Sequence, residues 1–369
     1  MSAPWYRLHT PAAVPSPALL LYPERIDENI RRMIALAGDP ARLRPHLKTH
    51  KLAEVLQLQT ARGITKFKCA TIAEAELAAE CGVPDLLLAY QPVGPNVGRL
   101  LRLVARFPAT QFSALADDAD ALRALASACA GAGVQLPVLL DIDCGQHRTG
   151  VAPGPGAIAL YQLLATLPGL TPGGLHAYDG HIQGEDPAAR TRDGEAAFAL
   201  VRALRQELRA AHLPVPRVVA GGTPTFPIHA RRRDVECSPG TCVLWDQGYA
   251  TRLPDLAFVP AAVVLTRVVS RPGRGRLCLD LGHKAIAAEH PPPRVHFLDL
   301  PDATPVAHSE EHLVIETPQA HAFKVGDCLY GVPWHICPTV ALYAEVTAVV
   351  AGEAVARWPV RARARALSI

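Results

Sequence analysis

A cluster of basic residues at positions 44–51 is the stretch of this chain best suited to chemistry. It reads Arg-Pro-His-Leu-Lys-Thr-His-Lys, so Lys48 has basic residues on both sides. Residues 41–47 can run as a strand and residues 52–59 have the spacing of an amphipathic helix. This order predicts that Lys48 follows the carboxyl end of a strand, where barrels and doubly wound sheets build their active sites.

The neighbours of Lys48 predict a reactive amine. We expect Arg44, His46, His50 and Lys51 to disfavour its ammonium form by like charge, together with partial burial. A lysine amine held in this way is a good nucleophile toward a carbonyl group, as a Schiff base requires. The alternative interpretation is a solvated basic patch or a phosphate-binding cluster. We expect no other lysine at a comparable strand end.

A family resemblance favours the first interpretation. The order Arg-Pro-His-x-Lys-Thr-His-Lys resembles the pyridoxal 5'-phosphate (PLP) lysine motif of the D-threonine aldolase and D-serine dehydratase family. Other segments similar to that family follow in the same order. The resemblance implies the barrel fold that the family shares with alanine racemase. It also implies that Lys48 holds PLP and that Lys48 and His46 are catalytic.

The composition predicts a cytoplasmic enzyme with one large and one smaller domain. The chain has 369 residues, of which 49% are hydrophobic and 19% are charged, enough for a large core. Lys and Arg number 37 against 34 Asp and Glu, without a long basic tract, so we expect no nucleic acid or membrane partner. No membrane-length apolar run and no signal peptide core are evident. The nine cysteines fit reduced thiols.

The first part of the chain alternates short apolar runs with helical patterns. Predicted helices include 72–80, 97–106 and 118–132. This alternation favours an α/β fold with a (β/α)8 barrel over an open doubly wound sheet, and we place the PLP-binding barrel at 16–250. The strand candidates are 18–22, 43–47, 66–70, 85–90, 111–115, 137–142, 172–178 and 217–220.

The pattern changes after residue 252. Strand-like runs separated by Gly- and Pro-rich turns predict a C-terminal antiparallel β domain at 251–369, joined by residues 1–15. No long helical pattern interrupts them. The strand candidates are 263–270, 276–280, 313–316, 327–330 and 343–349.

Two polar segments close predicted strands. Arg148 lies in the first and could be an ordinary loop cation, whereas Tyr178 in the second could be an aromatic side chain at the rim. The family resemblance implies that Arg148 faces the pyridine nitrogen of PLP, where a permanent cation keeps that nitrogen neutral. It implies that Tyr178 contacts the cofactor. His176 shares one side of the strand with Tyr178, so both could point inward.

A glycine pair after the last predicted barrel strand is the best candidate for a phosphate site. Gly221 and Gly222 would let backbone amides approach an anion, and Thr223 and Thr225 add hydroxyl donors. A glycine pair alone is more often a simple turn. The similar segment of the resembled family is a phosphate cup.

The segment Val-Pro-Trp-His-Ile-Cys-Pro-Thr carries the predicted metal ligands. His335 and Cys337 lie two apart, and on an extended segment they would project to one side and could bind a transition metal such as zinc. The resemblance implies a metal-binding histidine here, followed by a second ligand. Dehydratases of the family typically have cysteine at that second position and aldolases aspartate. Thiolate favours zinc, and carboxylate favours magnesium or manganese.

These features predict a PLP- and metal-dependent lyase acting on D-β-hydroxy-α-amino acids. Residues 64–76 resemble the aldolases most, so D-threonine aldolase is favoured. A D-serine or D-3-hydroxyaspartate dehydratase is the alternative, because of Cys337. A non-catalytic PLP-carrier barrel is a third possibility. The resemblance further implies a homodimer.

Overall fold

The computed structural model describes residues 4–368, and these divide into two compact units. The parallel unit contains residues 33–48, 59–240 and the C-terminal residues from 364 onward. The antiparallel unit contains the residues up to 32, residues 49–58 and residues 241–363. Helices α1 (Pro23–Ala37) and α2 (Ala53–Ala61) have residues in both units.

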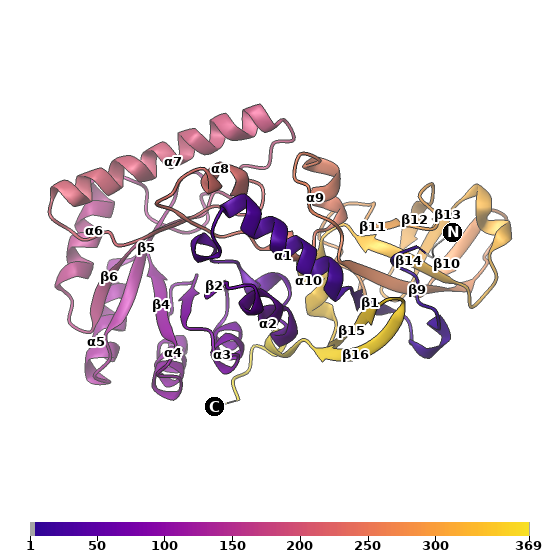
Figure 1. Cartoon of the computed structure of the whole chain (residues 1–369), viewed down its shortest axis with the longest axis horizontal. Coiled ribbons are helices and arrows are strands. Elements are labelled where there is room, and N and C mark those ends of the chain that lie inside the picture. The colour runs from indigo at the N-terminus through magenta and orange to yellow at the C-terminus, as the bar shows by residue number, and fades with distance from the viewer. Residues whose placement is uncertain (1–3, 369) are drawn as a thin grey trace. The chain divides into compact units, whose positions relative to one another are not determined.

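The parallel unit is a half-barrel of alternating strands and helices. Within the described residues it has a seven-stranded sheet in the order β2 to β8, and every neighbouring pair is parallel. Figure 1 shows α3, α4 and α5 along the outside of these strands. The predicted α/β alternation is therefore confirmed. The strands are β2 (Lys66–Cys69), β3 (Asp85–Leu88), β4 (Gln111–Ala116), β5 (Leu136–Ile142), β6 (Leu170–Ala177), β7 (Val218–Ala220) and β8 (Glu236–Cys237).

Local sequence explains the helices of this unit. Thr71, Asp118 and Asp186 act as N-cap residues, because each side chain accepts a hydrogen bond from a backbone N–H of the first turn. Apolar strand residues fill the interior, where Leu87, Leu115, Leu139 and Val219 pack together. The helices are α3 (Ile72–Glu80), α4 (Pro95–Arg106), α5 (Ala119–Gly131), α6 (Pro155–Thr166), α7 (Pro187–Ala210) and α8 (Phe226–Ala230).

The closed ring of eight strands that the sequence predicted is not what the structure has. The predicted first strand is β1 (Ala18–Leu21), but it pairs with β9 (Ala262–Ser270) and β15 (Glu345–Val350) in the other sheet. An apolar run signals a buried strand without specifying its partner. Residues 43–47 form single parallel bridges, Leu43 to Cys237 and His46 to Lys68, and no strand. Pro45 lies between these bridges and has no N–H to extend the ladder.

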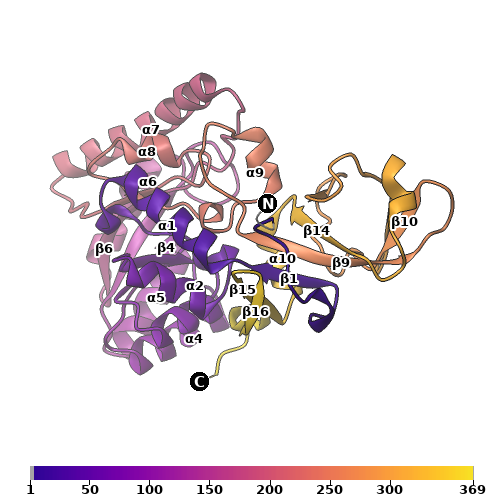
Figure 2. The same ribbon diagram turned by 45° about the vertical axis from the view of Figure 1, so that its right-hand side comes forward.

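The antiparallel unit confirms the predicted antiparallel β domain. Over the described residues its sheet has nine strands, in the order β12-β13-β10-β9-β1-β15-β16, with β14 pairing to both β9 and β11. Figure 2 shows the long strand β9 running through this sheet. The remaining elements are α9 (Gln247–Arg252), β10 (Arg276–Leu279), β11 (Val295–Phe297), β12 (Thr304–His308), β13 (Leu313–Glu316), β14 (Cys328–Pro333), α10 (Ile336–Leu342) and β16 (Glu353–Pro359). Across residues 4–368 every helix is too short or too polar to span a bilayer.

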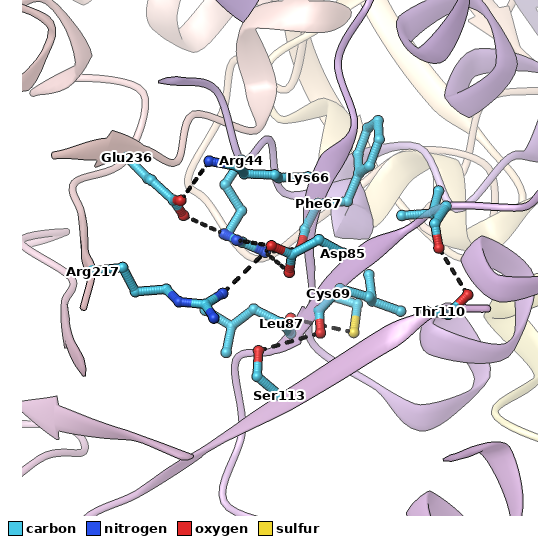
Figure 3. A network of polar contacts seen from close by, with 12 residues as sticks. Arg44, Lys66, Phe67, Cys69, Asp85, Leu87, Thr110, Ser113, Arg217 and Glu236 are labelled. Atoms are coloured by element: carbon cyan, nitrogen blue, oxygen red, sulfur yellow. Dashed lines mark hydrogen bonds and ion pairs between the residues drawn. The ribbon is translucent and has the colours of Figure 1, made fainter. Parts of the chain in front are cut away.

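A buried ion cluster joins the amino ends of the parallel strands (Figure 3). Arg44 is fully buried, with Nη1 and Nη2 each 2.8 Å from an oxygen of Asp85 and Nε 2.7 Å from Glu236. Lys66 also contacts Glu236 at 2.7 Å, and Arg217 lies 3.4 Å from Asp85. Burial alone would raise the pKa of Asp85, but the Arg44 guanidinium holds it below its ordinary value.

Candidate active site

A polar pocket lies where the strands of the parallel unit end. Parallel strands bring their carboxyl ends to one edge, so residues from distant segments meet there. Four of the predicted site residues line it, namely Lys48, His46, Arg148 and Tyr178. The other lining residues are Lys68, Ala89, Leu115, Asp141, Ile142, Gln146, Thr149 and His176.

Lys48 lies in a single 3-10 turn, η3 (Leu47–Thr49), directly after the bridge residue His46. The Lys48 backbone N–H donates to His46 Nδ1 at 3.3 Å, so the two predicted catalytic residues are tied together. The Lys48 side chain is half-buried. Its Nζ lies 5.9 Å from the centre of the Tyr178 ring.

Two of the basic neighbours of Lys48, Arg44 and His50, do not place a free positive charge beside it as predicted. Arg44 is turned to the amino ends of the strands, where Asp85 and Glu236 neutralise it. His50 is buried beside the backbone of Leu52, and burial lowers the pKa of His50 to about 3, which leaves it neutral. Sequence neighbours on a turn point in different directions, so adjacency in the chain did not produce adjacency of charge.

Lys68 is the functional candidate that sequence reasoning missed. It lies at the carboxyl end of β2, is 2% exposed, and places its Nζ 5.7 Å from the centre of the Tyr178 ring. The expectation that Lys48 has no counterpart at another strand end is therefore wrong. Burial is the main cause that lowers the pKa of Lys68 to about 7, and Lys48 adds to it. The available signal was a lysine between two apolar residues of a strand, Phe67 and Cys69.

A chain of hydrogen bonds links Lys68 to a buried carboxylate. Lys68 Nζ lies 3.4 Å from His176 Nε2, and His176 Nδ1 lies 2.7 Å from Asp141 Oδ1. Thr149 Oγ1 donates to the other oxygen of Asp141 at 2.9 Å. Burial lowers the pKa of His176, and the nearby Lys68 lowers it further. Burial alone would raise the pKa of Asp141, but His176 and Thr149 hold it below its ordinary value.

The glycine turn after β7 packs against the Tyr178 ring. Gly221 has a φ of +79°, and a Cβ there would lie 2.5 Å from His229, so only glycine fits. A Cβ on Gly222 would lie 2.9 Å from the Tyr178 ring. Thr223 is buried, and its Oγ1 accepts a hydrogen bond from Gly240 N at 3.3 Å. The turn therefore brings backbone amides close to the pocket aromatic.

The hydroxyl group of Thr225 is hydrogen-bonded to the carboxylate of Asp179. Its Oγ1 donates to Asp179 Oδ1 at 2.7 Å and accepts from Gly222 N at 3.3 Å. The second oxygen of Asp179 lies 2.7 Å from His229 Nε2, and both side chains are buried. Because a hydroxyl has one hydrogen, Thr225 supports the turn in this arrangement instead of donating to a bound anion. The Asp179–His229 pair was not identified from the sequence.

The predicted metal ligands lie in the antiparallel unit. The backbone of His335 is extended, whereas Cys337 lies inside α10. The two residues therefore do not lie on the one extended segment that the sequence had predicted. The two side chains nevertheless contact each other, and this contact holds the pKa of the Cys337 thiol below its ordinary value despite burial. Cys337 Sγ also lies 3.3 Å from Thr49 Oγ1 and 3.5 Å from Thr241 Oγ1.

Glu289 is a further candidate that the sequence did not indicate. Its carboxylate contacts His335 Nδ1. Among the described residues, Glu289, His290 and His335 form a group whose possible ligand atoms all lie within 4.8 Å of one another. A carboxylate on one ring nitrogen fixes the tautomer of a ligating histidine and leaves the other nitrogen for a metal.

Comparisons with known proteins agree with this arrangement. A family model described as "Alanine racemase, N-terminal domain" matches residues 22–246, and one described as "Putative serine dehydratase domain" matches residues 261–349. A D-threonine aldolase from Arthrobacter sp. is 32% identical over 362 residues, which is 95% of this chain and 93% of that protein. The chain belongs to the D-threonine aldolase and D-serine dehydratase family.

Two solved structures show that the D-threonine aldolase and D-serine dehydratase family fold extends over nearly the whole chain. D-threonine aldolase from Filomicrobium marinum has a TM-score of 0.90 at 29% identity, covering 96% of this chain and 97% of that chain. D-threo-3-hydroxyaspartate dehydratase from Delftia sp. HT23 has a TM-score of 0.84 at 26% identity, covering 94% and 97%. Both an aldolase and a dehydratase therefore share this architecture.

The residues present fit the two groups that the D-threonine aldolase and D-serine dehydratase family implies. For PLP, the pocket offers amines for its carbonyl, in Lys48 and Lys68, and a permanent cation, in Arg148. For a metal, the imidazole of His335 and the acidified thiol of Cys337 are donors that zinc prefers, and Glu289 is placed to orient the imidazole.

Proposed function

We propose that this chain is a lyase that cleaves D-β-hydroxy-α-amino acids between Cα and Cβ, as a D-threonine aldolase, with PLP and a divalent metal. The lyase class follows from family membership. The observation that carries the proposal is the pocket in which Lys48, Tyr178 and Arg148 converge at the strand ends.

The parallel unit would hold the cofactor. Bound PLP supplies an electron sink for breaking a bond at Cα. Lys48 would hold it through the ε-amine, and the ring of Tyr178 would contact it. Arg148 would place a permanent cation toward the pyridine nitrogen. The phosphate would lie at the glycine turn of Gly221 and Gly222, with Thr223 as a hydroxyl donor. His46, bonded to the backbone of Lys48, would position that residue.

The antiparallel unit would hold the metal. His335 and Cys337 would be its protein ligands, and Glu289 would orient the His335 ring. A Lewis acid at the substrate's β-hydroxyl group makes that proton easier to remove. The thiol favours zinc over manganese or magnesium.

The second candidate function is dehydration of a D-β-hydroxy-amino acid such as D-serine or D-3-hydroxyaspartate. Cys337 supports it, because cysteine is the second ligand expected of dehydratases. A D-threo-3-hydroxyaspartate dehydratase from Delftia sp. is 28% identical over 369 residues. A 3-hydroxy-D-aspartate aldolase from Paracoccus denitrificans is 29% identical over 372 residues, so an acidic substrate alone does not separate the reactions.

Three further features belong to this proposal. Residues 43–46 would take the place of the eighth strand of a (β/α)8 barrel. The parallel bridges from Leu43 to Cys237 and from His46 to Lys68 support this. The homodimer and the cytoplasmic location stay predictions.

The deciding experiment is incubation of the purified holoenzyme with D-threonine, D-serine and D-3-hydroxyaspartate, with L-threonine as the control for configuration. Glycine plus an aldehyde supports the aldolase, and a 2-oxo acid plus ammonia supports the dehydratase. Absence of turnover with every D-amino acid, while PLP stays bound, would favour a non-catalytic PLP carrier.

A further inference from the structure

Lys68 is a pocket residue to which the proposed reaction assigns no task. It is 2% exposed, and its Nζ lies at nearly the same distance from the Tyr178 ring centre as that of Lys48, 5.7 Å against 5.9 Å. Burying an ammonium group is costly unless a carboxylate pairs with it directly. The hydrogen-bond partner of Lys68 is instead an imidazole, at the long distance of 3.4 Å. This environment suits a neutral amine.

The tautomer of His176 determines what Lys68 can do. The Nδ1–H group of His176 donates to Asp141 at 2.7 Å, so Nε2 carries the lone pair and accepts a hydrogen from Lys68. A neutral Lys68 that donates to His176 keeps its own lone pair available to the pocket. If Lys68 takes up a proton, the polarised imidazole and the Asp141 charge behind it stabilise the new ammonium group.

The surrounding charges keep the two protonation states close in free energy. Burial, Lys48 and Arg44 disfavour the ammonium form, and Asp141 and Asp179 favour it, which gives a pKa of about 7. An acid–base group is most effective when its pKa lies near the working pH. The charges that act on Lys68 come from several segments, namely Lys48 from η3, Asp141 from β5, Asp179 from the loop after β6 and, most weakly, Arg44 from the bridge residues. His176 from β6 is its hydrogen-bond partner.

We propose that Lys68 is a second catalytic amine, which accepts the proton that an incoming amino acid's α-ammonium group loses before its nitrogen bonds to the cofactor. This inference rests on the proposed function. One N–H bond of the substrate breaks and one N–H bond forms at Lys68 Nζ. The electron pair stays on the substrate nitrogen and would bond to the cofactor carbon that Lys48 holds. The bond from that carbon to the Lys48 nitrogen would break, and the two remaining N–H protons of the substrate would pass to Lys48, which leaves as a free amine. Lys48 holds the cofactor, and Lys68 makes the incoming amine nucleophilic.

The first test measures capture of D-alanine by stopped-flow absorption of the holoenzyme. D-alanine has no β-hydroxyl group, so it can be captured but neither cleaved nor dehydrated. Lys68→Met should slow capture at pH 7 on the order of 10²-fold, the usual size of a general-base contribution. The loss should shrink as the pH approaches the pKa of the amino acid's own ammonium group, because a free amine needs no base. His176→Gln should show the same pH trend with a smaller loss.

Lys66→Met is the matched control. Lys66 lies on the same strand, but it contacts Glu236 in the ion cluster and does not line the pocket. This variant should capture D-alanine at the wild-type rate. Wild-type capture by Lys68→Met, or a defect equally large at every pH, would overturn the assignment. If the wild-type holoenzyme itself captures no D-amino acid, the proposed function fails first.

The second test needs no cofactor. Protein labelled with 15N at lysine Nζ is titrated by NMR in the apo form, and the Lys68 signal is the one missing from Lys68→Met. We expect that signal to titrate near pH 7. If it titrates together with the exposed lysines in the alkaline range, Lys68 is not the base.

Discussion

Lys48 is the residue on which cofactor attachment depends. Lys48→Ala should abolish the visible absorption of bound PLP and all turnover, because the amine that bonds to the carbonyl carbon is gone. Borohydride reduction of the wild-type holoenzyme, followed by peptide mapping, should place the PLP label on Lys48. Lys66→Ala should keep the label. A label on Lys68 in the wild-type protein would move the attachment site and also remove Lys68 as the base.

Cys337 is the residue that distinguishes one metal chemistry from another. Chelation should remove most activity and leave the absorption of bound PLP nearly unchanged, because cofactor attachment at Lys48 needs no metal. Cys337→Asp keeps an anionic ligand but replaces a soft thiolate sulfur with a hard carboxylate oxygen. The metal preference should therefore move from zinc toward manganese or magnesium. The ratio of glycine to 2-oxo acid from D-threonine should rise. Full activity of Cys337→Ala after exhaustive chelation would refute the metal site.

At the scale of elements, the loop between β7 and α8 depends on one buried hydroxyl. Thr225→Val removes the donor to Asp179 and the acceptor for Gly222 N, and a hydrogen bond to a charged group is worth about 1.5–3 kcal/mol. We expect weaker PLP retention, measured by spectral titration, together with a lower Tm. Thr225→Ser keeps the hydroxyl and should recover both. Unchanged PLP affinity in Thr225→Val would separate this loop from the phosphate site.

At the scale of the whole molecule, the buried ion cluster should dominate the stability of the parallel unit. Asp85→Asn leaves the buried guanidinium of Arg44 partly uncompensated, and breaking one partner of a buried pair typically costs about 3–5 kcal/mol. Chemical denaturation at pH 7 measures the loss. Asp120→Asn, in the exposed pair with Arg123, is the control and should cost less than about 1 kcal/mol. Equal small losses would contradict the prediction.

The sign of the pH dependence follows from the same carboxylate. The pKa of Asp85 is held below its ordinary value, because the hydrogen bonds and charge of Arg44 outweigh the effect of burial. Its contribution is therefore fully present above the unfolded pKa of about 3.9 and is lost as the pH falls through the lower folded value. The stability difference between wild type and Asp85→Asn should shrink over that acidic range.

The sequence by itself predicted many of the helices and strands, and the edge of the sheet at which the site residues lie. The predicted helix 72–80 coincides with α3 (Ile72–Glu80), because its cap and its apolar spacing are local properties. The family resemblance implied that Lys48, Arg148 and Tyr178 serve one cofactor, and the three residues line one pocket because parallel strands end at a common edge. Strand Ala18–Leu21 was recognised as a strand, but its sheet was not, because pairing depends on segments hundreds of residues away.

Only the tertiary structure decided which side chains meet and how they ionise. Arg44 turned to the amino ends of the strands, and Lys68 from β2 lines the same pocket as Lys48. Glu289 reached His335 across 46 positions. Protonation depends on burial and on charges supplied by all the packed segments together, so the lowered pKa of Lys68 has no counterpart in any short pattern of residues.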